Sequence, residues 1–121
     1  MFGYYLREKT NGDKSCEVRH EVTGFFLREV SLDKSLDIYR HSPDGFNWGY
    51  DCSGCSQLAL AILFDFTNDE SIAIKYYKPF RQCFISEAKT DDIISNASIQ
   101  TFLSQISDKI GKPLIGTVRK G

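Results

Sequence analysis

Two cysteines separated by two residues, Cys52 and Cys55, stand directly before the most apolar segment of the chain. A C-x-x-C pair at the start of a helix is the arrangement that stabilises a thiolate in thiol–disulfide oxidoreductases, and its spacing permits a disulfide. The preceding residues predict a β-meander and a loop, which is not the βαβ context of a thioredoxin-like site. Redox chemistry is therefore a candidate that the pattern does not favour.

The same pair would supply two of the four ligands of a structural zinc site. The residues available to complete it are Cys16, Cys83, His20 and His41. Cys16 and His20 share one predicted strand and lie about 13 Å apart along it, so they do not bind one ion together. We therefore predict no metal site and no cofactor, and we expect Cys16 and Cys83 to be small core residues.

The loop of residues 44–54 is a second candidate site, for a small anionic ligand. It leads into a predicted helix, whose free N–H groups and positive dipole end suit a phosphate or carboxylate. On this hypothesis the ligand-binding residues are Trp48, Gly49, Tyr50, Ser53 and Gly54. The alternative, which we favour, is that Ser53 caps the helix and the two glycines relieve tight packing against Trp48. The loop matches neither the phosphate-loop nor the dinucleotide-binding fingerprint.

The sequence shows no recognisable catalytic constellation. Ser53 stands at a turn into a helix with His41 upstream, but the G-x-S-x-G motif of a nucleophilic serine is absent. His20 and His41 have no obvious carboxylate partner, and Asp91 and Asp92 are better explained as charges at a helix N-terminus. We therefore assign no catalytic residue.

Two aromatic segments are candidate binding surfaces. If the chain is extended over residues 46–50, Phe46, Trp48 and Tyr50 share one face, and these rings either form a stacking platform or, as we favour, pack on a central helix. Residues 75–81 mix rings with positive charge, and we expect an exposed patch there that contacts a protein or another macromolecule. Its members are Tyr76, Tyr77, Lys78 and Arg81.

The elements that must position these residues begin with strands. Residues 4–9, 16–22 and 25–30 show the alternation of strands, and the Asn11-Gly12 pair tolerates the positive φ of a tight turn. This pattern predicts an antiparallel β-meander over residues 4–30. An irregular loop over residues 31–54 follows.

The remainder of the chain is predicted to be helical over residues 55–110. Residues 55–66 are apolar on nearly every side after Gln57, so this helix should be the buried centre of the domain. The Thr67-x-x-Glu70 spacing is that of a capping box and predicts a second helix, which Pro79 interrupts. Residues 79–86 then form either a short helix or a strand.

A last helix is predicted near the end of the sequence. The residues from Thr90 to Asp92 resemble a helix entry, and the apolar positions of residues 96–110 fall at helical spacing. Gly111 and Pro113 end this helix, and residues 111–121 form a short exposed or edge segment.

One stretch of this sequence resembles a known family. His41-Ser42-Pro43-Asp44-Gly45-Phe46-x-Trp48-Gly49-Tyr50, followed by Ser53-Gly54-x-x-Gln57-Leu58-Ala59-Leu60-Ala61-Ile62-Leu63-x-Asp65, is similar to a family of small uncharacterised bacterial, archaeal and phage proteins, grouped as a domain of unknown function. The resemblance is specific over residues 40–66 and implies no activity. Asp51 and Cys52 stand where the family usually has glycine, and Cys55 stands where it usually has proline.

Length and charge narrow the remaining classes of protein. The chain has 121 residues, with 15 Lys and Arg against 16 Asp and Glu. This predicts one α+β domain over residues 1–121, in which the meander packs on three to four helices. The near-neutral balance gives no field for nucleic acid, and the lack of a long apolar run or a signal peptide predicts a cytoplasmic protein with no membrane contact. We expect a non-catalytic binding or adaptor protein, with a ligand or enzymatic site at residues 44–54 as the alternative.

Overall fold

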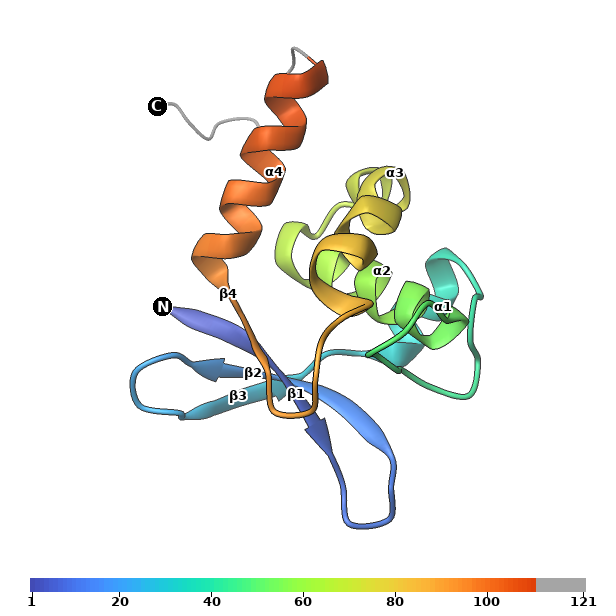
Figure 1. The fold of residues 1–121 in the computed structure, drawn as a ribbon, viewed down its shortest axis with the longest axis vertical. Coiled ribbons are helices and arrows are strands. Elements are labelled where there is room, and N and C mark those ends of the chain that lie inside the picture. Colours follow the sequence, from blue (N-terminus) through green and yellow to red (C-terminus); the bar gives the residue numbers. More distant parts are fainter. Residues whose placement is uncertain (111–121) are drawn as a thin grey trace.

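The computed structural model describes residues 1–110, and the predicted C-terminal segment, residues 111–121, lies outside them. The fold is α+β, as the sequence predicts, with one sheet and a layer of helices on one of its faces (Figure 1). In chain order the elements are β1 (Phe2–Glu8), β2 (Lys14–His20), β3 (Phe26–Glu29), α1 (Leu32–Ile38), α2 (Ser53–Thr67), α3 (Glu70–Phe80), the π-helical turn η1 (Arg81–Ile85), β4 (Ile93–Ser95) and α4 (Asn96–Ile110).

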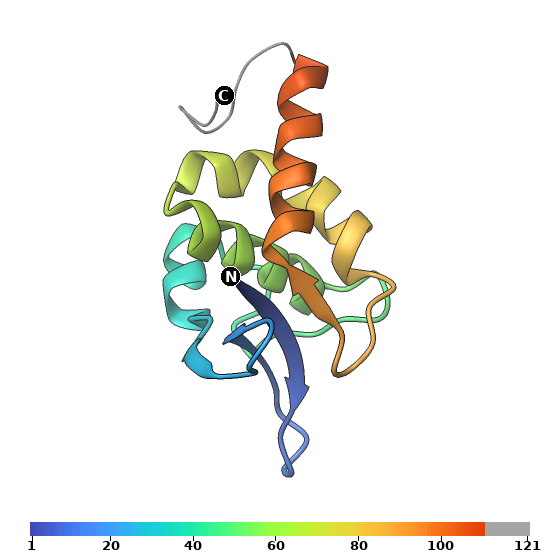
Figure 2. The same cartoon turned by 90° about the vertical axis from the view of Figure 1, so that its left-hand side faces the viewer.

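The predicted meander is confirmed, and a fourth strand extends it. The sheet is antiparallel with the order β3-β2-β1-β4. Tyr4 and Leu6 of β1 lie opposite Val18 and Cys16 of β2, and all four side chains are buried against the helices. The β1–β2 turn passes through Gly12, whose φ of 91° suits a glycine, and it projects away from the helices (Figures 1 and 2).

The helix entry predicted at Thr90–Asp92 is wrong. Asp91 has a φ of 74°, and its backbone N–H donates to the carbonyl of Leu6. The N–H of Leu6 in turn donates to the carbonyl of Asp92. These bonds turn the chain onto the free edge of β1, where β4 pairs with it before α4 begins. A strand of only three residues gives too short a run for its alternation to be read.

The loop predicted over residues 31–54 contains a short helix, α1. Ser31 caps it, because its Oγ accepts a hydrogen bond from the N–H of Lys34 at 3.1 Å. Ser35, in the middle of α1, is buried against α2. The sequence gives this seven-residue helix little apolar periodicity, so its cap was the one available signal.

The helix α2 is the buried centre of the domain, as predicted, and it lies between the sheet and α3 (Figure 2). Every residue from Gly54 to Leu63 is buried. Asp65 ties α2 to the sheet: its carboxylate accepts from the Tyr4 hydroxyl at 2.7 Å and from the Arg28 guanidinium at 2.7 Å. Burial, together with this carboxylate, raises the pKa of Tyr4 far above its ordinary range, so its hydroxyl stays protonated.

The capping box predicted at Thr67 and Glu70 is wrong. Thr67 is the last residue of α2, and its hydroxyl donates to the carbonyl of Leu63. Asp69 caps α3 instead, because its carboxylate accepts from the N–H of Ile72 at 3.2 Å. Pro79 does not interrupt α3. The chain continues as η1, so the helical alternative for this segment is confirmed and the strand is excluded.

The last helix, α4, has the predicted limits and projects beyond the other helices (Figure 1). Its first half buries Ile99, Phe102 and Leu103. The ring of Phe102 meets Phe80 and Phe84 edge to face, with centroids 5.3 and 5.8 Å away. Among residues 1–110, no helix is long and apolar enough to cross a bilayer.

Candidate functional site

Trp48, a proposed ligand-binding residue, belongs to the core. It is 4% exposed, and its indole N–H lies 3.3 Å from the hydroxyl of Thr90. The next residue, Gly49, has a φ of 93° and donates its N–H to the carbonyl of Ile85 at 3.0 Å. This turn needs a glycine, because a Cβ there would also crowd the carbonyl of Ala88. The core role that we favoured for Trp48 is confirmed.

The three aromatic residues of this loop do not share one face. Phe46 is half-buried, Trp48 is buried, and Tyr50 is 56% exposed. The Tyr50 hydroxyl accepts a hydrogen bond from the Asn47 side chain at 3.0 Å. The shared face expected for an extended chain is lost because Gly49 turns the chain before Tyr50. The expectation that the three rings pack together on the central helix is therefore wrong for Tyr50, which lies in solvent.

The start of α2 is covered by the loop that precedes it. A Cβ on Gly54 would lie 2.8 Å from the Cβ of Asn47 and 3.0 Å from its backbone nitrogen. Gly54 therefore permits close packing, which is the role we favoured for it. Ser53 is exposed and does not cap the helix; Cys52 does, because its Sγ accepts from the N–H of Cys55 at 3.1 Å.

The four cysteines fall into three environments. Cys52 and Cys55 are joined by a disulfide, with Cys52 partly exposed and Cys55 fully buried. Cys16 is a core residue as predicted, and burial raises the pKa of its thiol well above the ordinary value. Cys83 is exposed on η1, so its predicted place in the core is wrong. Within the described residues, no group of three or more His, Cys, Asp or Glu side chains could hold a metal ion.

The expected aromatic and basic patch does not form at the surface. Tyr76 and Tyr77 are 5% and 8% exposed, because both face the core from the buried side of α3. Lys78 is exposed. The guanidinium of Arg81 is largely buried, where it donates to the hydroxyl of Ser56 at 2.8 Å. The rings and charges therefore lie on different sides of α3, with Tyr76 and Tyr77 turned to the core and Lys78 in solvent.

Tyr77 contacts His41 instead, and the charge of Arg81 acts on it. His41 is the first residue of the stretch that resembles the known family. The His41 ring stacks on Tyr39, with centroids 4.4 Å apart, and lies at a tilt of 49° to the Tyr77 ring, with centroids 4.9 Å apart. Burial, and then the charges of Arg81 and Lys78, lower the pKa of His41 below its usual 6.5. The ring is therefore neutral at neutral pH.

Gln57 is a structural residue whose role the sequence did not reveal. It is fully buried, and its Oε1 accepts from the backbone N–H groups of His41 at 2.7 Å and Ser42 at 3.0 Å. Its Nε2 donates to the hydroxyl of Ser35 and to the carbonyl of Tyr39. One side chain thus fixes α1 and the start of the long loop to α2. A polar residue within an otherwise apolar helix was the signal that could have found it.

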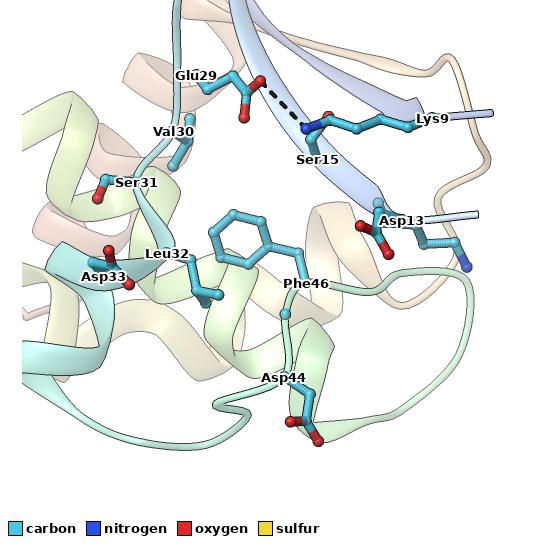
Figure 3. Close-up of a pocket in the computed structure, with 12 residues that line it drawn as sticks. Lys9, Asp13, Ser15, Glu29, Val30, Ser31, Leu32, Asp33, Asp44 and Phe46 are labelled. Atoms are coloured by element: carbon cyan, nitrogen blue, oxygen red, sulfur yellow. Dashed lines mark ion pairs between the residues drawn. The ribbon is translucent and has the colours of Figure 1, made fainter. Parts of the chain in front are cut away.

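A groove opens beside the first residues of the candidate loop (Figure 3). It has a volume of about 510 Å³ and lies between the β1–β2 turn, the β3–α1 junction and the loop. Its apolar part is formed by the side chains of Val30, Leu32 and Phe46, and the Phe46 ring lies at the centre of the view. Ser53 and Gly54 do not line this groove.

The groove around the Phe46 ring is lined by more acidic than basic side chains. The groove is lined by two lysines and by four carboxylates, which belong to Asp13, Glu29, Asp33 and Asp44. Within residues 1–110, Glu29 is the only one of these four that forms an ion pair, with the Lys9 ammonium at 3.6 Å. In Figure 3 the other three carboxylates stand on three sides of the ring.

The ammonium of the second lysine, Lys14, already contacts two residues of the loop. Its ammonium donates to the Asn47 side chain at 2.8 Å and lies 5.4 Å from the centre of the Trp48 ring. One further group in the groove lacks a partner among the described residues: the hydroxyl of Ser15, whose residue is 6% exposed. The groove therefore has a negative rim, an apolar centre and one unsatisfied polar group.

Comparison with known proteins places the chain in a family. A family model matches residues 10–105, which covers most of the chain. The chain belongs to the family of unknown function DUF6166. The DUF6166 match begins within the β1–β2 turn, so it includes β2 and β3 as well as the loop and helices on which the resemblance rested. A search of curated proteins finds no match, and neither does a search of solved structures.

Proposed function

We propose that this protein is a non-catalytic binding domain that holds a basic segment of a partner protein in the groove of Figure 3. The observation that carries the proposal is the unequal charge of the groove. Of its two lysines, Lys9 pairs with Glu29, and Lys14 contacts Asn47 and Trp48. The carboxylates of Asp13, Asp33 and Asp44 form no ion pair with a described residue.

A lysine or arginine side chain fits this composition. Its aliphatic part would cover the Phe46 ring and Leu32, and its charged end would approach a carboxylate of the rim. Because the three carboxylates belong to different segments, one cation cannot neutralise all of them. An extended segment with more than one basic residue therefore suits the groove better than a single amine.

Ser15 adds a polar anchor for such a segment. A buried hydroxyl without a partner is costly, and a carbonyl of the bound chain would accept its hydrogen bond. The anion-binding alternative receives less support, because Asn47 covers the start of α2 and the rim of the adjacent groove would repel an anion.

Charge-neutralising variants test the proposal, with a fluorescent hexa-arginine peptide as the probe. Asp13→Asn combined with Asp33→Asn should weaken its binding about fivefold to tenfold in fluorescence anisotropy, because each exposed ion pair contributes roughly 0.2–1 kcal/mol. The matched control is Glu70→Gln with Glu87→Gln, which removes the same charge from exposed positions outside the groove. Equal losses in the two variants would mean that the peptide senses only the net charge, and the proposal would fail.

A further inference from the structure

We propose that Cys52 and Cys55 form a thiol–disulfide exchange site that cycles between a disulfide and a dithiol. The two sulfurs are bonded in the structure, and they differ in access. Cys55 is fully buried, whereas Cys52 is partly exposed at the end of the loop. A thiol from solution therefore reaches one sulfur of the pair, the Sγ of Cys52.

The helix α2 stabilises negative charge on that sulfur. Cys52 is the N-cap of a 15-residue helix, and its Sγ accepts the N–H of Cys55 at 3.1 Å. The N–H group and the positive end of the helix dipole both favour a thiolate over a neutral sulfur at this position. Cys52 thus has the setting of a nucleophile in the reduced protein.

The environment of Cys55 also favours reduction. Its Sγ lies 2.8 Å from the carbonyl oxygen of Tyr50. A thiol can donate a hydrogen bond to that oxygen and a disulfide sulfur cannot, so reduction gains a bond. The link spans a sequence separation of only three residues, so it restricts the unfolded chain little and is a weak structural staple.

The exchange proceeds in two steps with a low-molecular-weight thiol. Its thiolate attacks the Cys52 Sγ, the S–S bond breaks, and the electron pair leaves on Cys55, which takes a proton from solvent and donates to the Tyr50 carbonyl. A second thiolate then attacks the external sulfur of the mixed disulfide and releases the Cys52 thiolate. Two thiols are oxidised to one disulfide while the protein disulfide is reduced, and the reverse sequence oxidises the dithiol.

A redox titration tests the site in the full chain carrying Cys83→Ser, which removes an exposed thiol outside the pair. The protein is equilibrated with mixtures of reduced and oxidised glutathione, quenched with acid, alkylated and weighed as an intact chain. We expect a reversible transition of two alkylated thiols within mixtures that contain both forms. A disulfide that persists in reduced glutathione alone, or a dithiol that persists in oxidised glutathione alone, would overturn the proposal.

Two further substitutions in the same background test the assigned roles. Cys55→Ser, treated with oxidised glutathione alone, should accumulate a single glutathione adduct that peptide mapping places on Cys52, because the protein has no thiol at position 55 to displace it. Cys52→Ser is the matched control and should react at least about tenfold more slowly, because Cys55 is buried. Circular dichroism shows whether each variant keeps the fold, and equal reaction rates in two folded variants would contradict the roles.

Discussion

Asp44, Gly45 and Phe46 line an open groove, whereas Trp48, Gly49 and Gly54, which follow them, are fixed by contacts with the rest of the domain. In the first part the Asp44 carboxylate forms no ion pair with a described residue. In the second part the Asn47 side chain accepts a hydrogen bond from Lys14 and donates one to Tyr50, and Gly54 packs against it. One continuous stretch thus lines the groove in which we propose that a partner binds and, a few residues later, becomes a structural segment.

The difference shows that a recognisable sequence pattern need not mark a binding site along its whole length. In the second part Trp48 packs in the core, Gly49 makes the turn, and Gly54 permits close packing of the loop on α2. The groove depends instead on Asp13, Ser15 and Asp33, which lie outside that pattern. Substitutions on the two sides of this division should therefore differ in what they change, stability on one side and binding on the other.

Removal of the Gln57 amide should cost the most stability. Gln57→Leu leaves the part-buried backbone N–H groups of His41 and Ser42 without their acceptor, at about 1–3 kcal/mol for each unsatisfied group. We expect a loss of roughly 3 kcal/mol in the free energy of unfolding, measured by urea denaturation. The control is Gln105→Leu on the exposed side of α4, which should change stability by less than about 0.5 kcal/mol.

Gly54→Ala should have the next largest effect. The new Cβ would overlap Asn47, whose backbone cannot move without disturbing the loop, while alanine regains some helix propensity. We expect a net loss of about 1–2 kcal/mol by urea denaturation. Ser53→Ala, one residue earlier and exposed, should be nearly neutral. An unchanged stability for Gly54→Ala would mean that the loop does not rest on the helix.

Ser15→Ala should separate binding from stability. The hydroxyl has no partner in the free protein, so its removal should not lower the free energy of unfolding. The bound hexa-arginine peptide would lose one hydrogen bond, and its affinity should fall about threefold to tenfold in fluorescence anisotropy. A stability loss without an affinity loss would place Ser15 in the fold alone.

His41 should produce a smaller effect that depends on pH. Its pKa in the folded protein lies below 6.5, so between that value and 6.5 the unfolded chain binds more protons than the folded one. Stability should therefore be fully present above about pH 6.5 and decline as the pH falls through this window. An NMR titration of the His41 ring should give a midpoint below 6.5, and a midpoint above 6.5 would contradict the burial and the neighbouring Arg81 charge.

The fold was largely predictable because its main elements carry strong local patterns. The strand alternation around Asn11-Gly12 and the apolar run after Gln57 were sufficient for the meander and the central helix. The failures are short elements held by tertiary contacts. β4 pairs with residues 3–5 of β1, after backbone bonds between Leu6 and residues 91–92 bring the chain to that edge. α1 is held by the buried Ser35. Neither contact leaves a trace in local sequence.

The candidate site was less predictable for the same reason. Residues 44–46 were within the predicted loop, but the groove also needs the β1–β2 turn and the β3–α1 junction. Nothing in the spacing of Asp13, Asp33 and Asp44 shows that the fold brings them to one groove. The exposed patch expected at Tyr76 and Tyr77 failed because the rings point inward from α3, and local composition does not show which side of a helix faces the core.

The most direct test of the central claim is an NMR titration of the isotopically labelled chain with hexa-arginine, followed through its backbone amides. The account predicts that shift changes concentrate at residues 13–15, 29–33 and 44–46, and that a hexa-glutamate peptide leaves these amides unchanged. Shift changes spread evenly over the surface, or concentrated on α3 and α4 with residues 44–46 unaffected, would contradict it.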